Sequence, residues 1–117
     1  MRVYHANYLK FIERARSKLI ESISIDQRAL LLEEKKIFVV KNITADYQLP
    51  AYFGDNLVIC TSLVELKKAS MVLKQEILRE DKKIFDSIVR LALLNSSEKP
   101  EKFSADMVLD IKKFFAN

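Results

Sequence analysis

Residues 3–16 read Val-Tyr-His-Ala-Asn-Tyr-Leu-Lys-Phe-Ile-Glu-Arg-Ala-Arg, a run in which an aromatic, histidine-containing start leads directly into an amphipathic pattern. From position 8 the apolar side chains recur at the spacing of one helix face, at Tyr8, Phe11, Ile12, Ala15, Leu19 and Ile20. Charged residues such as Lys10, Arg14 and Lys18 lie between them. No glycine or proline interrupts the run, so the pattern predicts one long helix over residues 5–21.

Around this helix, the rest of the sequence predicts a short helix, four strands and a closing helix. The short helix covers residues 26–33, with Asp26 near its positive end. Runs rich in β-branched and aromatic residues predict strands at 37–47, 57–66, 70–78 and 83–95. Ser104 is a typical N-cap for the closing helix at 105–115. The chain is expected to be a single domain over residues 1–117.

The strand patterns indicate how the sheet is built. The separators at 67–69 and 80–82 are short and charged, which suits antiparallel hairpins. In the first strand, one face is expected to carry Val39, Ile43, Ala45 and Tyr47. The last strand is apolar on both faces, which favours a central or interface position. The sequence thus predicts an α+β fold, with an antiparallel meander sheet wrapped on one long helix.

Composition excludes several classes of function. The single glycine leaves no glycine-rich phosphate loop, and a single cysteine, Cys60, allows no disulfide within the chain. One cysteine and one histidine give no pair at metal-ligand spacing, so no metal site is expected. Cys60 lies in an apolar, strand-like run and is expected to be a core or interface residue.

Charge and hydropathy also limit location and partners. No apolar run approaches the ~20 residues of a membrane span, and no signal-peptide core is visible, so a cytoplasmic protein without membrane insertion is expected. The net charge of +4 comes from 20 basic and 16 acidic residues, which are interleaved along the chain. Aromatic residues do not alternate with the basic ones as in a base-stacking surface, so nucleic acid is not an expected partner.

The Tyr-His-Ala-Asn-Tyr run at residues 4–8, followed by its amphipathic helix, resembles one enzyme family. This family is the hotdog-fold acyl-CoA thioesterases related to 4-hydroxybenzoyl-CoA thioesterase, and the resemblance extends from Val3 to the last strand. It implies a hotdog fold, an acyl-CoA substrate, a homodimer that often pairs into a tetramer, and no metal or tightly bound cofactor. The family includes thioesterases encoded with the Tol-Pal envelope system, which implies a bacterial, lipid-related role.

The family pattern also places a catalytic aspartate ahead of this run. A first strand and a segment of the type Asp-Thr-Asp-Ala-Gly-Gly-Val-Val precede it in the family, and the second aspartate acts as nucleophile or general base. Only Met1, Arg2 and Val3 precede Tyr4 here, so that strand and aspartate would fall before Met1. We therefore expect an acyl-CoA thioester hydrolase with impaired activity. The alternative is a shortened, non-catalytic hotdog protein that keeps dimerisation and acyl, CoA or acyl carrier protein binding.

The same resemblance assigns roles near the start of the long helix. The backbone N–H of Tyr4 would polarise the thioester carbonyl, since a helix N-terminus meets negative charge without reorganising. His5 matches the family histidine and would assist catalysis; the alternative is a histidine that caps or packs the helix start. Asn7 would contact substrate or serve as a local cap.

A second group of candidates lies between the second and third strands. Lys67, Lys68 and Ser70 occupy the place where the family's CoA phosphates meet basic side chains, often across the dimer. The alternative is a solvated hairpin tip. None of the acids Glu13, Asp46 and Asp55 is a clear substitute for the family's aspartate.

Overall fold

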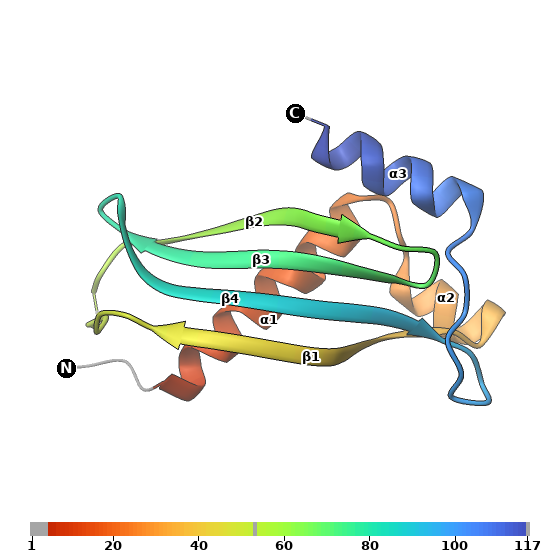
Figure 1. The fold of residues 1–117 in the computed structure, drawn as a ribbon, viewed down its shortest axis with the longest axis horizontal. Helices are drawn as coiled ribbons and strands as arrows, with labels where there is room; N and C mark the ends of the chain where they lie inside the picture. The colour runs from red at the N-terminus through yellow and green to blue at the C-terminus, as the bar shows by residue number, and fades with distance from the viewer. Residues whose placement is uncertain (1–4, 53, 117) are drawn as a thin grey trace.

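The structure is a computed structural model, and it describes residues 5–52 and 54–116. Its elements, labelled in Figure 1, are α1 (His5–Ser22), α2 (Gln27–Glu34), β1 (Ile37–Tyr47), β2 (Leu57–Leu66), β3 (Ser70–Arg79), β4 (Lys82–Leu94) and α3 (Ala105–Phe115). Each lies within one residue of the bounds expected from the sequence. Within the described ranges, no helix is long and apolar enough to cross a membrane.

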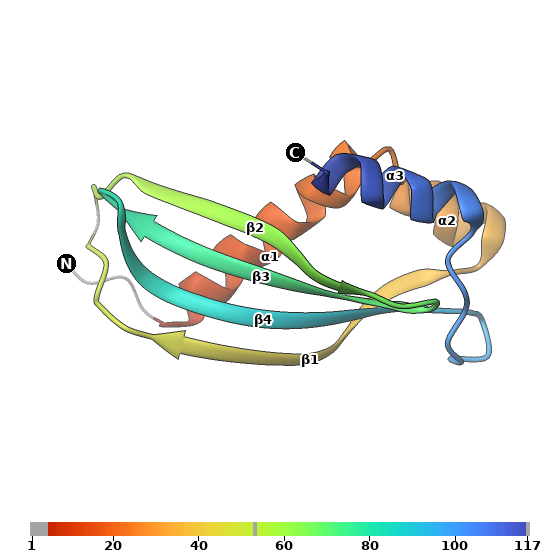
Figure 2. The same cartoon turned by 45° about the horizontal axis from the view of Figure 1, so that its top comes forward.

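The four strands form one antiparallel sheet in the order β1-β4-β3-β2. The predicted α+β fold, with a sheet wrapped on one long helix, is confirmed (Figures 1 and 2). The sheet is not a simple meander, however: β2, β3 and β4 are successive neighbours, but β1 pairs with β4 rather than with β2. β4 lies between β1 and β3, so the central position that the sequence favoured is confirmed. Its face away from α1 is not fully apolar, because it carries Asp86, Arg90 and the partly exposed Ile88.

A β-bulge corrects one detail of the first strand. Ile43 pairs with Val89, and Tyr47 with Phe85, whose side chains face the helix. The register shifts between Val40 and Asn42, so Val39 pairs with Ala92 on the opposite face. The expectation that Val39 shares a face with Ile43, Ala45 and Tyr47 is therefore wrong, because the extra residue reverses the alternation.

Helix α1 lies along the concave face of the sheet and divides the core into two clusters (Figure 2). Near its start, Tyr8 and Ile12 pack with Ala51, Ile77, Ile84 and Phe85. Near its end, Ile20 and Ile23 belong to a larger cluster with buried residues of β3 and β4, which α2 and α3 join through Leu30 and Ile111. The helix thus has its start at one end of the sheet and its end at the other.

The two shorter helices begin with the caps expected from the sequence. The carboxylate of Asp26 accepts the N–H of Ala29 at 3.0 Å, and the hydroxyl of Ser104 accepts the N–H of Met107 at 3.1 Å. Each cap satisfies one of the N–H groups that a helix start leaves without a partner.

Candidate active site

Helix α1 begins at His5, inside the Tyr-His-Ala-Asn-Tyr run. The N–H groups of its first turn have no partners within the helix, and the helix dipole makes this end positive. Tyr4 and the side chain of His5 lie outside the part of the chain that the structure describes. Asn7 is half-buried in the first turn. The described geometry therefore contains the first turn of this helix from His5 onward, whereas the expected donor, the N–H of Tyr4, lies outside it.

An aromatic cluster packs between the first turns of α1 and the sheet. The buried ring of Tyr8 stacks on Tyr47 with centroids 5.6 Å apart, and Phe85 meets both rings edge-on at 5.6 and 5.0 Å. Such pairs add to the stabilisation from apolar burial. Tyr8, Tyr47 and Phe85 come from α1, β1 and β4, so the cluster fixes the first turns of the helix against two strands.

The connection after β1 is held against the same place. The hydroxyl of Tyr8 accepts the N–H of Ala51 at 2.7 Å. Arg79, at the end of β3, donates to the carbonyl of Pro50 at 2.6 Å and lies 3.5 Å from the carboxylate of Asp55. Asp55 in turn accepts the N–H of Tyr52 at 2.8 Å. The carboxylate of Asp55 thus already contacts the Tyr52 N–H and the Arg79 guanidinium. Glu13, the other acid near this end of α1, is exposed.

A groove of about 430 Å³ lies between α1 and the edge strand β2. Its lining residues are Phe11, Arg14, Ala15, Lys18, Asp55, Leu57 and Ile59. Phe11, Leu57 and Ile59 make it largely apolar, while Arg14 and Lys18 lie one helical turn apart and add positive charge. This combination suits a molecule with an apolar part and an anionic part.

The second group of candidates lies at the other end of the sheet. Lys67 and Lys68 are exposed in the turn between β2 and β3, and Ser70 begins β3. Strands of this length extend about 33 Å at ~3.3 Å per residue, so one chain does not bring these residues to the start of α1. Arg90, which sequence reasoning missed, joins them: its guanidinium lies 3.5 Å from the hydroxyl of Ser70.

Comparison with known proteins identifies the family of this chain. A family model described as thioesterase superfamily matches residues 2–85. The chain belongs to the thioesterase superfamily.

Two curated relatives and one solved structure illustrate this membership. The acyl-CoA thioesterase YbgC of Haemophilus influenzae is 33% identical over 106 residues, covering 90% of this chain and 78% of that protein. YbgC of Helicobacter pylori is 47% identical over 75 residues, covering 64% of this chain; the match spans about half (53%) of that relative's length. A Thermus thermophilus thioesterase, solved with coenzyme A and Zn, has 23% identity and a TM-score of 0.84, covering 99% and 83% of the two chains. The predicted hotdog fold is confirmed.

This superfamily member also has a buried polar network that sequence reasoning missed. Arg16 is only 9% exposed, and its guanidinium donates to the side-chain oxygen of Gln75 at 2.9 Å. The Gln75 amide nitrogen donates to the carbonyl of Ile12 at 3.0 Å and to Thr61 at 3.3 Å. Burial lowers the pKa of Arg16, and the charge of Glu13 partly opposes this shift. Position 16 continues the four-residue spacing of Tyr8, Ile12 and Ile20, which was the available signal.

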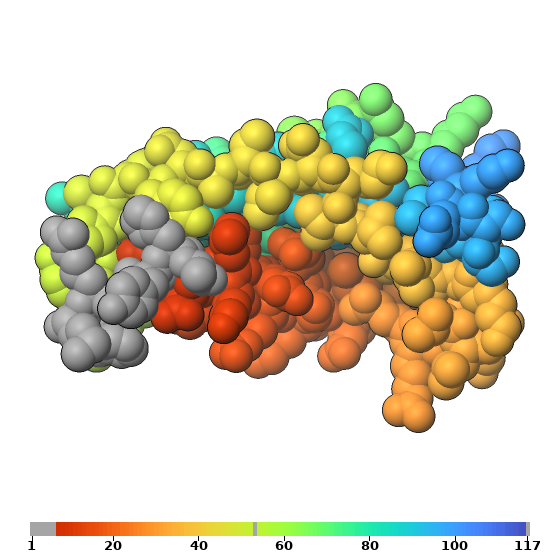
Figure 3. Space-filling view, turned by 90° about the horizontal axis from the view of Figure 1, so that it is seen from below, coloured from red at the N-terminus to blue at the C-terminus, as the bar shows by residue number. Residues whose placement is uncertain are grey.

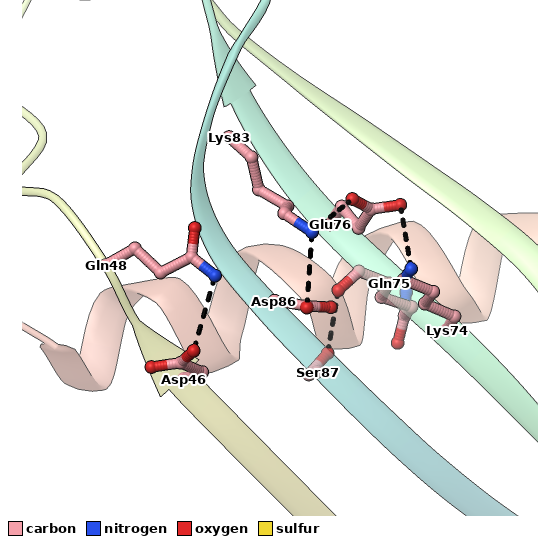
Figure 4. Close-up of polar contacts among 8 residues, drawn as sticks. All are labelled: Asp46, Gln48, Lys74, Gln75, Glu76, Lys83, Asp86 and Ser87. Atoms are coloured by element: carbon pink, nitrogen blue, oxygen red, sulfur yellow. Dashed lines mark hydrogen bonds and ion pairs between the residues drawn. The ribbon is translucent and has the colours of Figure 1, made fainter.

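On the face of the sheet away from α1, three carboxylates stand in one cross-strand row (Figure 4). Asp86 pairs with Asp46 on one side and with Glu76 on the other. The ammonium of Lys83 lies 3.4 Å from both Glu76 and Asp86, and its hydrogen bond to Glu76, followed by the charge of Asp86, raises its pKa. Among the described residues, no group of acidic, histidine or cysteine side chains has the arrangement of a metal site.

Cys60 lies beside this row. It pairs with Glu76 in the register of β2 and β3 and is exposed. The expectation of a core residue is therefore wrong, because Cys60 lies on the edge strand β2, on the face of the sheet that carries Glu76. The alternative expectation, an interface residue, stays a prediction.

Replacing Lys83 with methionine should lower the thermal midpoint at neutral pH, because it removes the ammonium that contacts both Glu76 and Asp86. These two carboxylates pair across β3 and β4, and like charges directly opposite each other in a sheet are destabilising. Because the pKa of Lys83 is raised in the folded state, its contribution is present below the ordinary lysine pKa of 10.5 and is lost at higher pH. The difference between parent and variant should therefore disappear in strongly alkaline solution. Thermal unfolding across pH checks this, with the exposed neighbour Lys82→Met as control; equal midpoints at pH 7 would contradict it.

Proposed function

We propose that this domain hydrolyses acyl-CoA thioesters. Water bonds to the carbonyl carbon, the carbon–sulfur bond breaks, and a proton goes to the sulfur, so that free acid and CoA leave. The observation that carries the proposal is the start of α1 within the Tyr-His-Ala-Asn-Tyr run, in a chain of the thioesterase superfamily. The names of its curated relatives support the same substrate class.

The chemistry of the site follows from the charge that develops during attack. Negative charge builds on the carbonyl oxygen, and a fixed backbone donor at the helix start, the N–H of Tyr4, would stabilise it by about 3–4 kcal/mol. His5 would orient water or protonate the leaving sulfur. The apolar groove beside α1 supports binding of an acyl group.

We further propose a homodimer formed through β1. This strand is at the sheet edge, and its apolar residues Val40 and Ile43 are 44% and 40% exposed. Figure 3 shows the molecule from the side of β1, α1 and α2. Edge strands invite pairing with another strand, and a second copy of β1 offers the same surface.

Antiparallel pairing of two β1 strands would reverse one sheet relative to the other. The end of one subunit that carries the start of α1 would then lie beside the opposite end of its partner. That opposite end carries Lys67, Lys68 and Ser70, with Arg90 next to them. Basic residues from one subunit would thus be available for CoA phosphates bound beside the helix start of the other.

One observation favours the alternative of binding without catalysis. Asp55 lies 3.5 Å from Arg79 and Glu13 is exposed, so neither of these two carboxylates is a clear substitute for the family's aspartate. A cytoplasmic dimer that binds acyl-CoA, or the acidic surface of an acyl carrier protein, would fit such a chain with its charge of +4.

The test compares the 117-residue chain with its His5→Ala variant. Benzoyl-CoA and short acyl-CoA hydrolysis would be followed by release of the CoA thiol. We expect the parent to hydrolyse these thioesters and His5→Ala to be at least about 100-fold slower, the usual scale of general acid–base catalysis. Equal rates would remove His5 from the reaction. CoA binding without hydrolysis by the parent would support the alternative, and neither binding nor hydrolysis would overturn both.

A further inference from the structure

We propose that Tyr8 and Arg79 are positioning residues, which clamp residues 50–52 to the first turns of α1 and so fix the helix start that polarises the thioester. This inference rests on the proposed function. It concerns side chains that would not touch the substrate and that act through the backbone around them.

The contact of Tyr8 with Ala51 is the first part of the clamp. Both residues are buried, and the hydroxyl of Tyr8 accepts the Ala51 N–H at 2.7 Å. A phenylalanine ring would fill the same space but leave this N–H without its partner, and an unpaired buried donor costs the full penalty of its lost hydration. The helix therefore holds the connection after β1 at one defined atom.

Arg79 holds the residues on either side of Ala51. Its guanidinium reaches the carbonyl of Pro50 at 2.6 Å and lies 3.5 Å from Asp55, which accepts the N–H of Tyr52 at 2.8 Å. The pair of Arg79 and Asp55 thus fixes the backbone at Pro50 and at Tyr52, on either side of Ala51. Hydrogen bonds that involve charged groups are stronger than neutral ones.

The preceding residues tie the same segment to the sheet. The N–H groups of Gln48 and Leu49 both donate to the carbonyl of Ile84 in β4, at 3.0 and 3.2 Å. Strands β3 and β4 therefore both contact residues 48–52 through hydrogen bonds, and Tyr8 links this segment to α1. In Figure 1 the segment and the helix start lie at the same end of the sheet.

Such an arrangement has a functional consequence because carbonyl polarisation depends on distance. The donor at a helix start must meet the oxygen at about 2.7–3.1 Å, and a displacement of ~1 Å can cost about 100-fold in rate. The aromatic cluster holds Tyr8 by packing, and the hydrogen bond to Ala51 adds a contact between two defined atoms. Through both, Tyr8 contributes to where the positive helix end lies.

The test measures carbonyl polarisation directly. The probe is benzoyl-CoA with a carbon-13 label at the thioester carbonyl, and its infrared stretch is recorded on binding to the full chain. We expect the parent to shift the stretch to lower frequency, and Tyr8→Phe and Arg79→Gln to lose at least half of that shift. Arg79→Lys should retain more of it than Arg79→Gln. The control is Arg28→Gln, which makes the same change at an exposed arginine of α2 and should behave as the parent.

Amide hydrogen exchange at Ala51 provides the second readout. In Tyr8→Phe it should be at least tenfold faster than in the parent, while slow exchange in the strand β3 verifies that the variant is folded. A full frequency shift in Tyr8→Phe, or unchanged exchange at Ala51, would overturn the positioning role while leaving the proposed function intact. No binding or no shift in the parent would overturn the proposed function itself.

Discussion

Gln75→Leu should lower the free energy of unfolding by about 3 kcal/mol, because it removes the partner of a charged group in the core. Gln75 is fully buried on β3 and is the described hydrogen-bond partner of the Arg16 guanidinium. Its amide nitrogen also links the sheet to the Ile12 carbonyl of α1. Leucine has a similar size, so the loss comes from hydrogen bonding and desolvation rather than from a cavity.

A double variant separates the cost of leaving Arg16 without its hydrogen-bond partner from the cost of removing the Gln75 side chain. In Arg16→Met with Gln75→Leu, both members become apolar and no buried charge remains, so most of the stability should return. Urea unfolding of the parent, both single variants and the double variant gives the coupling energy. Lys74→Leu, next to Gln75 but on the outer face, serves as the surface control. Additive losses in the double variant would contradict the role assigned to the pair.

Phe85→Ala should cost about 3–5 kcal/mol, the range for removing a buried aromatic ring. Phe85 is 0% exposed and contacts both Tyr8 and Tyr47, so its loss leaves a cavity directly below the start of α1. Because Tyr8 then loses one restraint, exchange of the Ala51 N–H should also become faster in this variant.

The matched control is Ile88→Ala on the same strand. Ile88 is 38% exposed on the opposite face, so its replacement should cost about 1 kcal/mol or less. Both variants and the parent would be compared by urea unfolding at neutral pH. Equal losses at the two positions would show that the face of β4 toward α1 does not form the core described above.

Much of the fold could be predicted because its elements are encoded locally. The apolar spacing of α1, the caps Asp26 and Ser104, and the β-rich runs each need only neighbouring residues to be recognised. The central place of β4 was also indicated by its own pattern, which is the most apolar of the four strands toward its end. The strand order and the bulge after Val40 did not, because pairing depends on partners distant in the sequence.

The candidate site, too, could be predicted only in part from the sequence. The run at residues 4–8 indicated the helix start and the family, and these depend on residue identity and order alone. The engagement of Asp55, the link from Tyr8 to Ala51 and the exposure of Cys60 were not predictable. Each results from segments that only the folded sheet brings together, or leaves uncovered.

The sequence by itself therefore determined the helices and strands, and the run at residues 4–8 indicated the family. Only the tertiary structure decided that a guanidinium lies buried against Gln75, that β1 pairs with β4, and that Lys67 and Lys68 lie at the far end of the sheet from His5. The physical reason is range: periodicity and capping act within a few residues, whereas burial, pairing and hydrogen-bond partners arise from contacts between residues that are far apart in the chain.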